Sequence, residues 1–508
     1  MAFHQAVLFS NEVSISMVEQ TIPNWLKKRT DLTPDRIAIH FRDSSITFRE
    51  LFYLAVKTAG QLSEVGLKKG QFAGVLLRNH QDTVFILLAL QMLGIKAVIL
   101  NNRLTPEEII WQLNDSHSSF LITEEAFDGH INEITGKIND LPIITKQNLF
   151  QKKGSSPEIL DEYHMNDVCT VMYTSGTTGH PKGVLQTYGN HWWSAIGSAL
   201  NLGLFETDTW LCAVPLFHIS GYSILVRSMI YGMTIVLHES FDEHETIKDI
   251  QKYNVTIMSV VSVMLKRMIN SLRDKTFPET FRCMLLGGGP APLSLLEKCI
   301  EKGIPVFQTY GMTETASQIV TLAPEYALSK LGSAGKALFP SEVKIVNSTG
   351  EKAAPFEEGE IYVKGPNVTI GYLNQDQGTK DSMQNGWLAT GDIGYMDEEG
   401  FLYVLDRRQD LIISGGENIY PAEIEGVLLS HPDIIDAGVT GLPDEKWGQI
   451  PAAVIVRSRR SKLSEEEVIS FCTEKLAKYK VPKKIIFVSE LPRNAAKKLL
   501  RRKLPNLF

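Results

Sequence analysis

The chain has 508 residues, of which 44% are hydrophobic and 21% are charged, a composition that excludes a disordered chain. Its 51 Lys and Arg against 58 Asp and Glu give a formal net charge of −7, which disfavours a general nucleic-acid binder because that function needs a broad basic surface. The five cysteines are scattered and form no C-x-x-C pair, a pattern typical of reduced, mostly buried thiols.

No segment is predicted to cross a membrane, because the most apolar stretch, 84–100, is short and is interrupted by Gln91 and Lys96. The N-terminus lacks the basic and apolar regions of a signal peptide, so we expect a cytoplasmic protein. Residues 1–20 carry no periodic pattern and are interpreted as a lead-in that need not be ordered.

Short apolar strands alternate with helical patterns through residues 21–405. In chain order, strands are expected at Phe72–Leu77, Ala97–Leu100, Val168–Tyr173, Val255–Val260, Cys283–Leu286 and Val306–Gln308, with helices at Asp82–Leu93, Val263–Ile269 and Leu293–Glu301. This alternation predicts βαβ units, and hence an α/β fold with mostly parallel sheets and flanking helices.

The pattern changes near residue 405. A charged run at 406–410 is predicted to be a hinge between a large domain, 21–405, and a small α+β domain, 411–508. In the small domain, helices are expected at Ala422–Leu429 and Glu465–Leu476, and strands at Ile434–Thr440, Ala452–Arg457 and Lys484–Val488.

Three unusual loops each follow a predicted strand of the large domain: Thr174–Gly183, Gly287–Pro292 and Tyr310–Glu314. Parallel sheets bind ligands beyond the carboxyl ends of their strands. We therefore expect the three loops to lie on one edge of a sheet and to form one composite site.

The first loop combines glycines, hydroxyl side chains and Lys182, which suits a phosphate chain because backbone N–H groups, hydroxyls and a cation all bind phosphate oxygens. It is not a Walker A loop, since Pro181 and Gly183 stand where that motif needs Gly and Ser or Thr. The alternative is a polar surface loop.

The other two loops suggest a nucleotide. Tyr310 could pack on a purine, Thr313 could bond a phosphate, and Glu314 could hold Mg²⁺. The segment 286–292 carries three glycines, which let a flat ring lie on the backbone, although a tight turn leading into a helix fits equally well.

Two further motifs lie nearer the C-terminus. Asp392 could accept hydrogen bonds from both hydroxyls of a ribose, although an aspartate in a turn is common. The segment 491–498 ends in Lys497 and Lys498, and a lone lysine there carries little information by itself.

Taken together and in this order, the five motifs resemble those of the acyl-adenylate-forming superfamily, which includes acyl-CoA and aryl-CoA synthetases, luciferases and stand-alone adenylation domains. The resemblance covers about residues 22–505. It implies a large N-terminal domain, a hinge and a mobile C-terminal lid. It also implies two half-reactions, in which a carboxylate attacks the α-phosphate of ATP and the thiol of CoA then displaces AMP.

The resemblance also implies roles for individual residues. ATP contacts are expected from Thr174, Ser175, Gly176, Thr177, Thr178, Gly179, Lys182, Gly288, Gly289, Pro290, Tyr310, Gly311, Met312, Asp392 and Arg407. Thr313 would touch the α-phosphate and Glu314 the Mg²⁺, and Asp406 matches the hinge. Gly415 and Gly416 would line the channel for CoA.

Lys498 matches the lysine that bridges the carboxylate and the α-phosphate, where a fixed cation stabilises the developing charge. The preceding position is often Gly in the family and is Lys497 here, so either lysine could point inward. The spacing to Pro492 favours Lys498.

Five further stretches, 215–221, 230–238, 317–322, 331–336 and 414–421, closely resemble the family of 2-succinylbenzoate–CoA ligases of menaquinone synthesis. That substrate keeps a second carboxylate, which needs a cation in the pocket. His218 and Arg227 are the candidates, with His218 also a candidate catalytic residue. On one helix they would lie on opposite faces, about 13 Å apart along the axis, and a surface arginine is the alternative for Arg227.

Several alternatives stay open at this stage. A general fatty-acyl or aryl-acid CoA ligase shares every catalytic motif, and an enzyme that loads a carrier protein or a luciferase-type oxygenase shares the adenylation half. A non-catalytic scaffold is disfavoured by the intact loop and by Glu314, Asp392 and Lys498. The expected partners are ATP, Mg²⁺, CoA and a carboxylic acid, with no nucleic acid and no membrane span, and a homo-oligomer is compatible with the sequence. A resident catalytic metal is not expected, because His238-Glu239…His244 does not match H-E-x-x-H.

Overall fold

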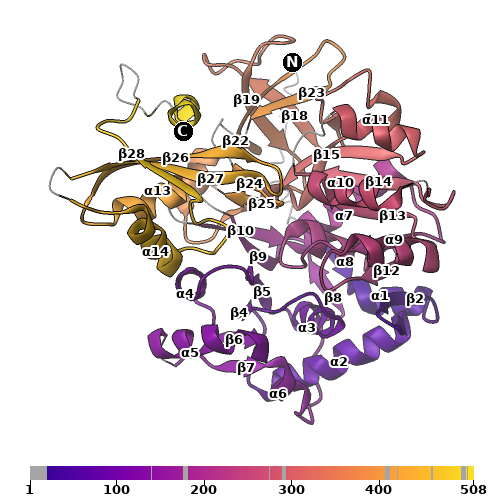
Figure 1. Cartoon of the computed structure of the whole chain (residues 1–508). Coiled ribbons are helices and arrows are strands. Elements are labelled where there is room, and N and C mark those ends of the chain that lie inside the picture. Colours follow the sequence, from indigo (N-terminus) through magenta and orange to yellow (C-terminus); the bar gives the residue numbers. More distant parts are fainter. Residues whose placement is uncertain are drawn as a thin grey trace, which may run out of the picture.

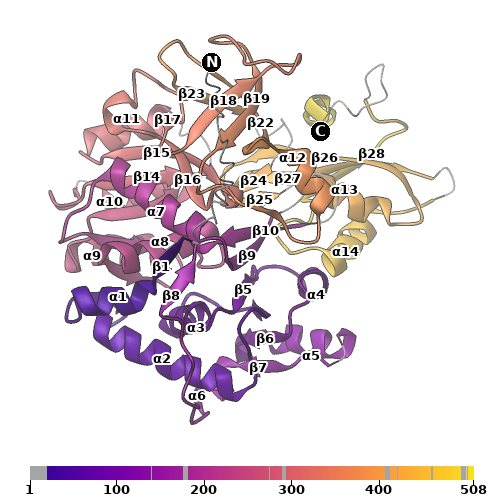
Figure 2. The same ribbon diagram turned by 180° about the vertical axis from the view of Figure 1, so that it is seen from behind.

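The computed structural model of the chain describes residues 20–138, 140–174, 181–273, 275–288, 293–406, 412–419, 421–458, 461–492, 499 and 501–508. The C-terminal part, gold and yellow in Figure 1, lies beside the rest of the chain, and its strands β24 and β25 come close to β9 and β10 in both views (Figure 1, Figure 2).

A first sheet has the strand order β20-β10-β9-β5-β4-β6-β7. Its strands are β20 (Gly371–Tyr372), β10 (Lys182–Thr187), β9 (Val168–Thr174), β5 (Lys96–Ile99), β4 (Phe72–Val75), β6 (Phe120–Thr123) and β7 (Ile143–Thr145). The pairs from β9 to β7 are parallel, whereas β9 pairs with β10 in the antiparallel sense. The strands are almost continuously apolar because both faces of such a sheet are covered.

A second sheet has the order β17-β16-β15-β14-β13-β11-β12-β2-β3. Its strands are β17 (Lys336–Ala337), β16 (Ser317–Leu322), β15 (Val306–Met312), β14 (Cys283–Gly287), β13 (Ile257–Val261), β11 (Thr209–Cys212), β12 (Thr234–Leu237), β2 (Ile37–Phe41) and β3 (Ser44–Thr47). The central pairs, from β15 to β2, are parallel.

Smaller sheets complete the architecture. An antiparallel sheet joins β18 (Glu342–Val346), β19 (Gly359–Lys364), β22 (Trp387–Met396), β21 (Met383–Gln384) and β23 (Leu402–Asp406), and β1 (Thr21–Pro23) pairs with β8 (Glu162–His164). The C-terminal sheet joins β25 (Glu417–Ile419), β24 (Ile412–Ser414), β27 (Gly448–Arg457), β26 (Ile434–Asp444) and β28 (Lys484–Phe487).

The α-helices are α1 (Trp25–Leu32), α2 (Phe48–Glu64), α3 (Gln81–Met92), α4 (Pro106–Asp115), α5 (Asp128–Lys137), α6 (Lys146–Phe150), α7 (Tyr188–Leu202), α8 (Ile219–Tyr231), α9 (Glu243–Lys252), α10 (Ser262–Leu272), α11 (Leu293–Glu301), α12 (Asp376–Ser382), α13 (Pro421–Leu429) and α14 (Glu465–Lys475). Several begin at capping boxes, such as Thr47 with Glu50 in α2 and Thr105 with Glu108 in α4, which satisfy the free N–H groups of the first turn. Helix α3 is buried along most of its length, because it lies between the sheets of the body.

The structure confirms the predicted α/β fold, with mostly parallel sheets in the large N-terminal part and a smaller C-terminal part. Two details of the prediction are wrong. The three special loops do not lie on one edge of one sheet, because Thr174 ends a strand of the first sheet while Gly287 and Tyr310 belong to the second. The strand expected at Val306–Gln308 continues to Met312, because pairing with β16 extends it through an irregularity at Tyr310 and Gly311. Among the described residues, no helix is both long and apolar enough to cross a membrane.

Candidate active site

A cleft of about 950 Å³ lies where both sheets of the body, the β18–β23 sheet and the C-terminal part meet. Many of the residues singled out in the sequence line it: Thr174, Lys182, His218, Arg227, Gly288, Gly311, Met312, Thr313, Glu314, Asp392 and Gly416. The Tyr310 hydroxyl donates a hydrogen bond to one of these residues, Asp392. The cleft therefore brings together side chains that are more than 200 residues apart in the sequence.

Several predicted residues lie outside the described residues: Ser175, Gly176, Thr177, Thr178, Gly179, Gly289, Pro290, Arg407, Lys497 and Lys498. For Asp406, the expected hinge residue, only the backbone is described, as the last residue of β23. The roles of these residues stay predictions.

The predicted phosphate loop connects two antiparallel strands. Thr174, the last residue of β9, pairs with Lys182, the first residue of β10. The Lys182 ammonium lies 4.8 Å from the centre of the Tyr372 ring, and the Tyr372 hydroxyl donates a hydrogen bond to Glu314 Oε1 at 3.3 Å. This places a cation from the loop near the carboxylate expected to hold Mg²⁺.

Thr313 and Glu314 lie on the short 3-10 turn that follows β15. Glu314 is buried and its carbonyl accepts a hydrogen bond from Thr369 N at 2.7 Å. Over the described part of the chain, no group of three or more His, Cys, Asp or Glu side chains is arranged to hold a metal. One buried carboxylate beside a phosphate site still suits Mg²⁺, which commonly takes one or two protein carboxylates together with phosphate oxygens.

Asp392 is buried and lines the cleft, and the Tyr310 hydroxyl donates a 2.5 Å hydrogen bond to its Oδ2. The Asp392 backbone N–H donates to Thr390 Oγ1 at 3.0 Å. These contacts fix a carboxylate next to an aromatic ring, as expected for residues that bind a ribose and its base.

Gly311 is required by close packing. A Cβ at this position would lie 2.1 Å from the Ser317 carbonyl oxygen and 2.7 Å from Gln318 Cα, so any side chain would separate β15 from β16. Gly288 has a φ of +85° at the rim of the cleft, a conformation that favours glycine.

Arg227 lines the cleft and is 1% exposed, which excludes the surface arginine considered from the sequence. Its Nη2 donates to Ser317 Oγ at 3.2 Å and its guanidinium lies 5.2 Å from the centre of the Trp210 ring. Its Nε has no hydrogen-bond partner among the described residues, and burial lowers the pKa of the guanidinium. None of the ion pairs among those residues involves Arg227, so its charge lacks a protein counterion there.

His218 immediately precedes α8 and is its N-terminal cap residue. Its Nε2 lies 3.5 Å from Oε2 of Glu417, which follows the glycine pair Gly415 and Gly416 in the C-terminal part, and Glu417 also pairs with Arg103. Burial raises the pKa of the Glu417 carboxyl, but the hydrogen bond and charge of His218, together with the charge of Arg103, lower it below its ordinary value.

Gly415 and Gly416 form the two-residue turn between β24 and β25, with φ angles of +58° and +88°. Two consecutive positive φ values are typical of the tight turns that join antiparallel strands. A Cβ on Gly415 would lie 2.7 Å from the Trp447 ring, and one on Gly416 would lie 3.3 Å from Val261 of the body. The turn therefore places the C-terminal part against the end of β13.

The sequence did not reveal the contact that Lys480 makes across the two parts of the chain. Its Nζ donates to Glu108 Oε1 at 2.7 Å and to Glu423 Oε1 at 2.6 Å, and all three side chains lie in the interface between α4 and the C-terminal part. No sequence signal could identify this cluster, because 372 residues separate Lys480 from Glu108.

Gln318 is a second residue that the sequence did not single out. It follows Ser317 on β16 and lines the cleft, and both polar atoms of its side-chain amide are buried without a partner among the described residues. Its presence in the stretch 317–322, quoted above for the family resemblance, was the available signal.

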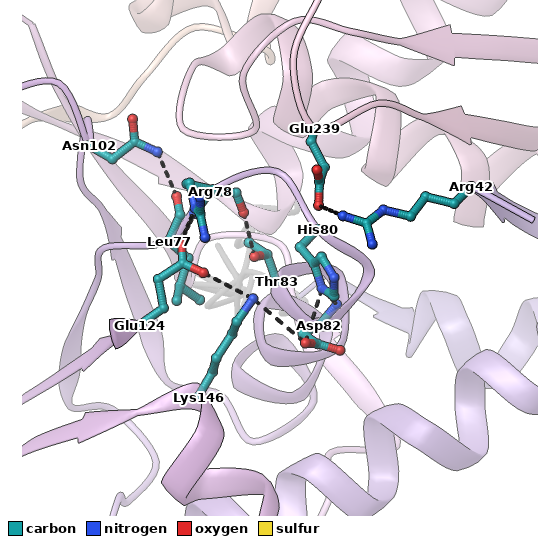
Figure 3. Close-up of polar contacts among 10 residues, drawn as sticks. All are labelled: Arg42, Leu77, Arg78, His80, Asp82, Thr83, Asn102, Glu124, Lys146 and Glu239. Carbon is teal, nitrogen blue, oxygen red and sulfur yellow. Dashed lines mark hydrogen bonds and ion pairs between the residues drawn. The ribbon is translucent and has the colours of Figure 1, made fainter. Parts of the chain in front are cut away.

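A polar cluster at the carboxyl ends of β4, β6 and β7 has a different character (Figure 3). Lys146 points toward Glu124, at 3.0 Å, and toward Asp82, at 3.7 Å. Arg78 Nε donates to Glu124 Oε1 at 2.8 Å. Cations and carboxylates compensate one another here, so this cluster ties the strand ends together and offers no unpaired charge to a ligand.

Comparison with known families agrees with this geometry. Residues 26–373 match the model of the AMP-binding enzyme family, and residues 423–498 match that of the AMP-binding enzyme C-terminal domain. The chain belongs to the AMP-binding enzyme family.

Within this family, the chain is 55% identical to the 2-succinylbenzoate–CoA ligase of Geobacillus kaustophilus, over 96% of this chain and 98% of that protein. It is 52% identical to the ligase of the same name from Bacillus anthracis, over 96% of this chain and 99% of that protein.

Two solved structures of o-succinylbenzoate CoA synthetase (MenE) from Bacillus subtilis are similar to the present one. Both are 51% identical and cover 96% of this chain and 98% of their own. The complex of a double mutant with the product analogue OSB-NCoA gives a TM-score of 0.91, and the complex with the acyl-adenylate OSB-AMP gives 0.75. Identity and coverage are equal for the two complexes, so the difference in TM-score reflects how the parts of the chain are arranged. The present arrangement is closer to that of the product-analogue complex.

Proposed function

We propose that the protein ligates 2-succinylbenzoate to CoA at the expense of ATP, as a step of menaquinone biosynthesis in the cytoplasm. The carboxylate of the succinyl group attacks the α-phosphorus of ATP, and the bond between the α- and β-phosphates breaks to release diphosphate. The CoA thiol then loses its proton to solvent and its sulfur attacks the acyl carbon. The bond between the acyl carbon and the oxygen that bridges to phosphorus breaks, and AMP leaves with that bridging oxygen.

The observation that carries this proposal is the buried guanidinium of Arg227, which lines a nucleotide-type cleft and forms no ion pair with any of the residues that the structure describes. A buried cation without a counterion is costly unless an anion arrives to compensate it. The reacting carboxylate must face the α-phosphate, so a second carboxylate on the substrate is the anion that suits Arg227. The names of the relatives at 52–55% identity supply the same substrate.

The nucleotide side of the cleft supports adenylation. Lys182 and the hydroxyl of Thr313 would bind phosphate oxygens, Glu314 would hold Mg²⁺ on them, and Asp392 would accept from the ribose hydroxyls. The Mg²⁺ ion would draw charge from the phosphate oxygens. Lys498 and the hinge at Asp406 belong to the same proposal, with the domain limits 21–405, 406–410 and 411–508.

The test is CoA-thioester formation followed by mass, with ATP and Mg²⁺, against 2-succinylbenzoate, benzoate, a medium-chain fatty acid and a long-chain fatty acid. We expect 2-succinylbenzoate to exceed the others by orders of magnitude. If a fatty acid or a simple aryl acid is preferred, the protein is a general acyl-CoA or aryl-CoA ligase.

Lys498→Ala tests the catalytic assignment. Removing a fixed charge from the transferred phosphate costs about 10²–10³-fold in rate, so adenylation should fall by that factor while thioester formation from supplied acyl-AMP persists. Equal loss of both steps would contradict the assignment, and Lys497→Ala is the matched control.

A further inference from the structure

The backbone turn 313–317 joins the ATP side of the cleft to its acyl side. Thr313 and Glu314 line the first, whereas Ser317 accepts the hydrogen bond of Arg227 at the second. Ala316 has a φ of +51° and Ser317 a φ of +117°, conformations that residues with a Cβ rarely adopt. Such a turn persists only where its surroundings fix it.

Hydrogen bonds fix this turn through five successive carbonyl oxygens. Gln186 Nε2 donates to Thr313 O at 2.7 Å, Thr369 N to Glu314 O at 2.7 Å, Asn367 Nδ2 to Thr315 O at 3.0 Å, Ser194 Oγ to Ala316 O at 2.6 Å, and Thr315 Oγ1 to Ser317 O at 2.6 Å. The four donors outside the turn are all buried. None of these four residues lines the cleft, so the shape of the turn is set by groups outside it.

The orientation of the Gln186 amide is fixed by its two partners. The carbonyl of Thr313 can only accept, so Gln186 Nε2 faces it, and Gln186 Oε1 then accepts from the Thr170 hydroxyl at 2.8 Å. Thr170 Oγ1 also lies 2.9 Å from Nε2 of the fully buried His191, and burial lowers the pKa of that imidazole to about 3. Because the single hydroxyl hydrogen of Thr170 goes to Gln186, the neutral ring donates from Nε2 to Thr170, and the whole chain of bonds runs in one direction toward Thr313.

Ser194 acts at the other end of the turn. It lies on α7, which packs against α8 and β16. Ser194, Ala316 and Arg227 border the same small internal gap. Because Ser194 holds the carbonyl of Ala316, it sets the orientation of the next residue, Ser317, whose hydroxyl meets Arg227.

We propose that Gln186 and Ser194 are positioning residues with separable effects: Gln186 sets Thr313 and Glu314 for ATP, and Ser194 sets Ser317 and Arg227 for the acyl substrate. This assignment rests on the proposed function, since it takes the two sides of the cleft as the ATP and acyl sites.

The experiment measures KM for ATP and for the acid separately, together with melting temperature, for Ser194→Ala and Gln186→Leu. Loss of one buried hydrogen bond corresponds to about a fivefold change in an equilibrium constant such as a binding constant. We expect Ser194→Ala to raise KM for the acid by about that factor and to leave KM for ATP unchanged, and Gln186→Leu to do the reverse. Ser194→Thr keeps the hydroxyl and should restore KM for the acid.

Matched controls separate positioning from folding. Ser228→Ala removes a buried serine that donates to Met233 O at 2.8 Å, and Gln61→Leu removes a buried glutamine that donates to Lys152 O at 2.9 Å. Both should lower the melting temperature and leave both KM values unchanged. If Gln186→Leu does not fold, Thr170→Val, which frees the amide of Gln186, should raise KM for ATP in the same sense.

The proposal is overturned if Ser194→Ala and Gln186→Leu behave like the controls, or if each raises both KM values equally. The proposed function fails separately, if the wild-type protein does not ligate 2-succinylbenzoate. The KM values are then measured with the acid that it does ligate, and the same split decides the positioning roles.

Discussion

Two buried cations face the same cleft, and they differ in what surrounds them. Lys480 lies between two carboxylates, Glu108 of α4 and Glu423 of α13, at 2.7 and 2.6 Å. Arg227 contacts a serine hydroxyl and the face of a tryptophan ring, with no ion pair among the described residues. Both side chains are at most 5% exposed.

The difference shows how a buried charge indicates its role. A cation that already has its anions inside the protein holds parts of the protein together, and here it joins the body to the C-terminal part. A cation without an anion adds a desolvation cost to the folded state, which a ligand of opposite charge can offset. The first arrangement indicates assembly, and the second indicates a binding site.

Replacing Arg227 tests whether this buried cation binds the substrate, and it should have the largest effect of the substitutions that test this comparison. Arg227→Leu should raise KM for 2-succinylbenzoate by about a hundredfold or more, because removing one partner of a buried charge pair costs about 2–5 kcal/mol. KM for ATP should stay within a small factor of the wild-type value. Steady-state kinetics with each substrate varied in turn measures both.

The melting temperature of Arg227→Leu gives a second test of the same prediction. Since none of the described residues compensates the charge of Arg227, Arg227→Leu should unfold at or above the wild-type temperature. Arg29→Leu is the matched control, because this half-buried arginine holds the carbonyls of Met229 and Ile230 at the end of α8. It should lose stability and keep KM, and an unchanged KM in Arg227→Leu would remove Arg227 from the acyl site.

Replacing Lys480 tests whether this buried cation joins the body to the C-terminal part. Lys480→Met leaves two carboxylates facing each other, and breaking a buried pair costs about 3–5 kcal/mol, part of which proton uptake by one carboxylate offsets. We expect thioester formation from supplied acyl-AMP to fall about tenfold and adenylation to persist, because the present arrangement is closer to the product-analogue complex.

Lys137→Met is the control for this prediction. Lys137 of α5 pairs at 2.8 Å, on the exposed surface, with Glu107 of α4, the helix that also carries Glu108. Such a pair contributes about 0–1 kcal/mol, so neither half-reaction should change. A selective loss of adenylation in Lys480→Met would place the cluster in the other half-reaction.

The smallest effect concerns pH. Burial and the negative charge of Glu108 raise the pKa of Glu423 to about 7, since one lysine cannot compensate two carboxylates. The folded state then holds this proton more tightly than the unfolded chain. The stability that it contributes is complete below the unfolded pKa, about 4.3, and is lost as pH rises through 7.

Glu423→Gln removes this titration. The variant should melt at the wild-type temperature at pH 5 and a few degrees higher at pH 8, where the wild-type carboxylate is charged. The lowered pKa of Glu108 acts below this window, because its contribution is lost only at more acidic pH. A difference between the two proteins that does not change with pH would contradict the assignment.

Much of the local structure could be predicted from the sequence. The helix expected at Leu293–Glu301 has these bounds in the structure, and the strand expected at Cys283–Leu286 differs by one residue. Periodic burial depends on neighbouring residues, so it is visible in a short window of sequence. The extension of β15 to Met312 was not visible in such a window, because it depends on pairing with β16 and on the missing side chain of Gly311.

By itself the sequence determined the α/β class, the order of most strands and helices, and the motifs that meet in the cleft. A motif whose residues are close in the sequence, such as the glycines and hydroxyls around Lys182, can be identified without tertiary information. Only the tertiary structure decided that the loops belong to two sheets, that Arg227 is buried without a counterion in the described part of the chain, and that Lys480 meets Glu108. The physical reason is that burial and charge compensation depend on which distant segments pack together, and a linear pattern carries no record of those distances.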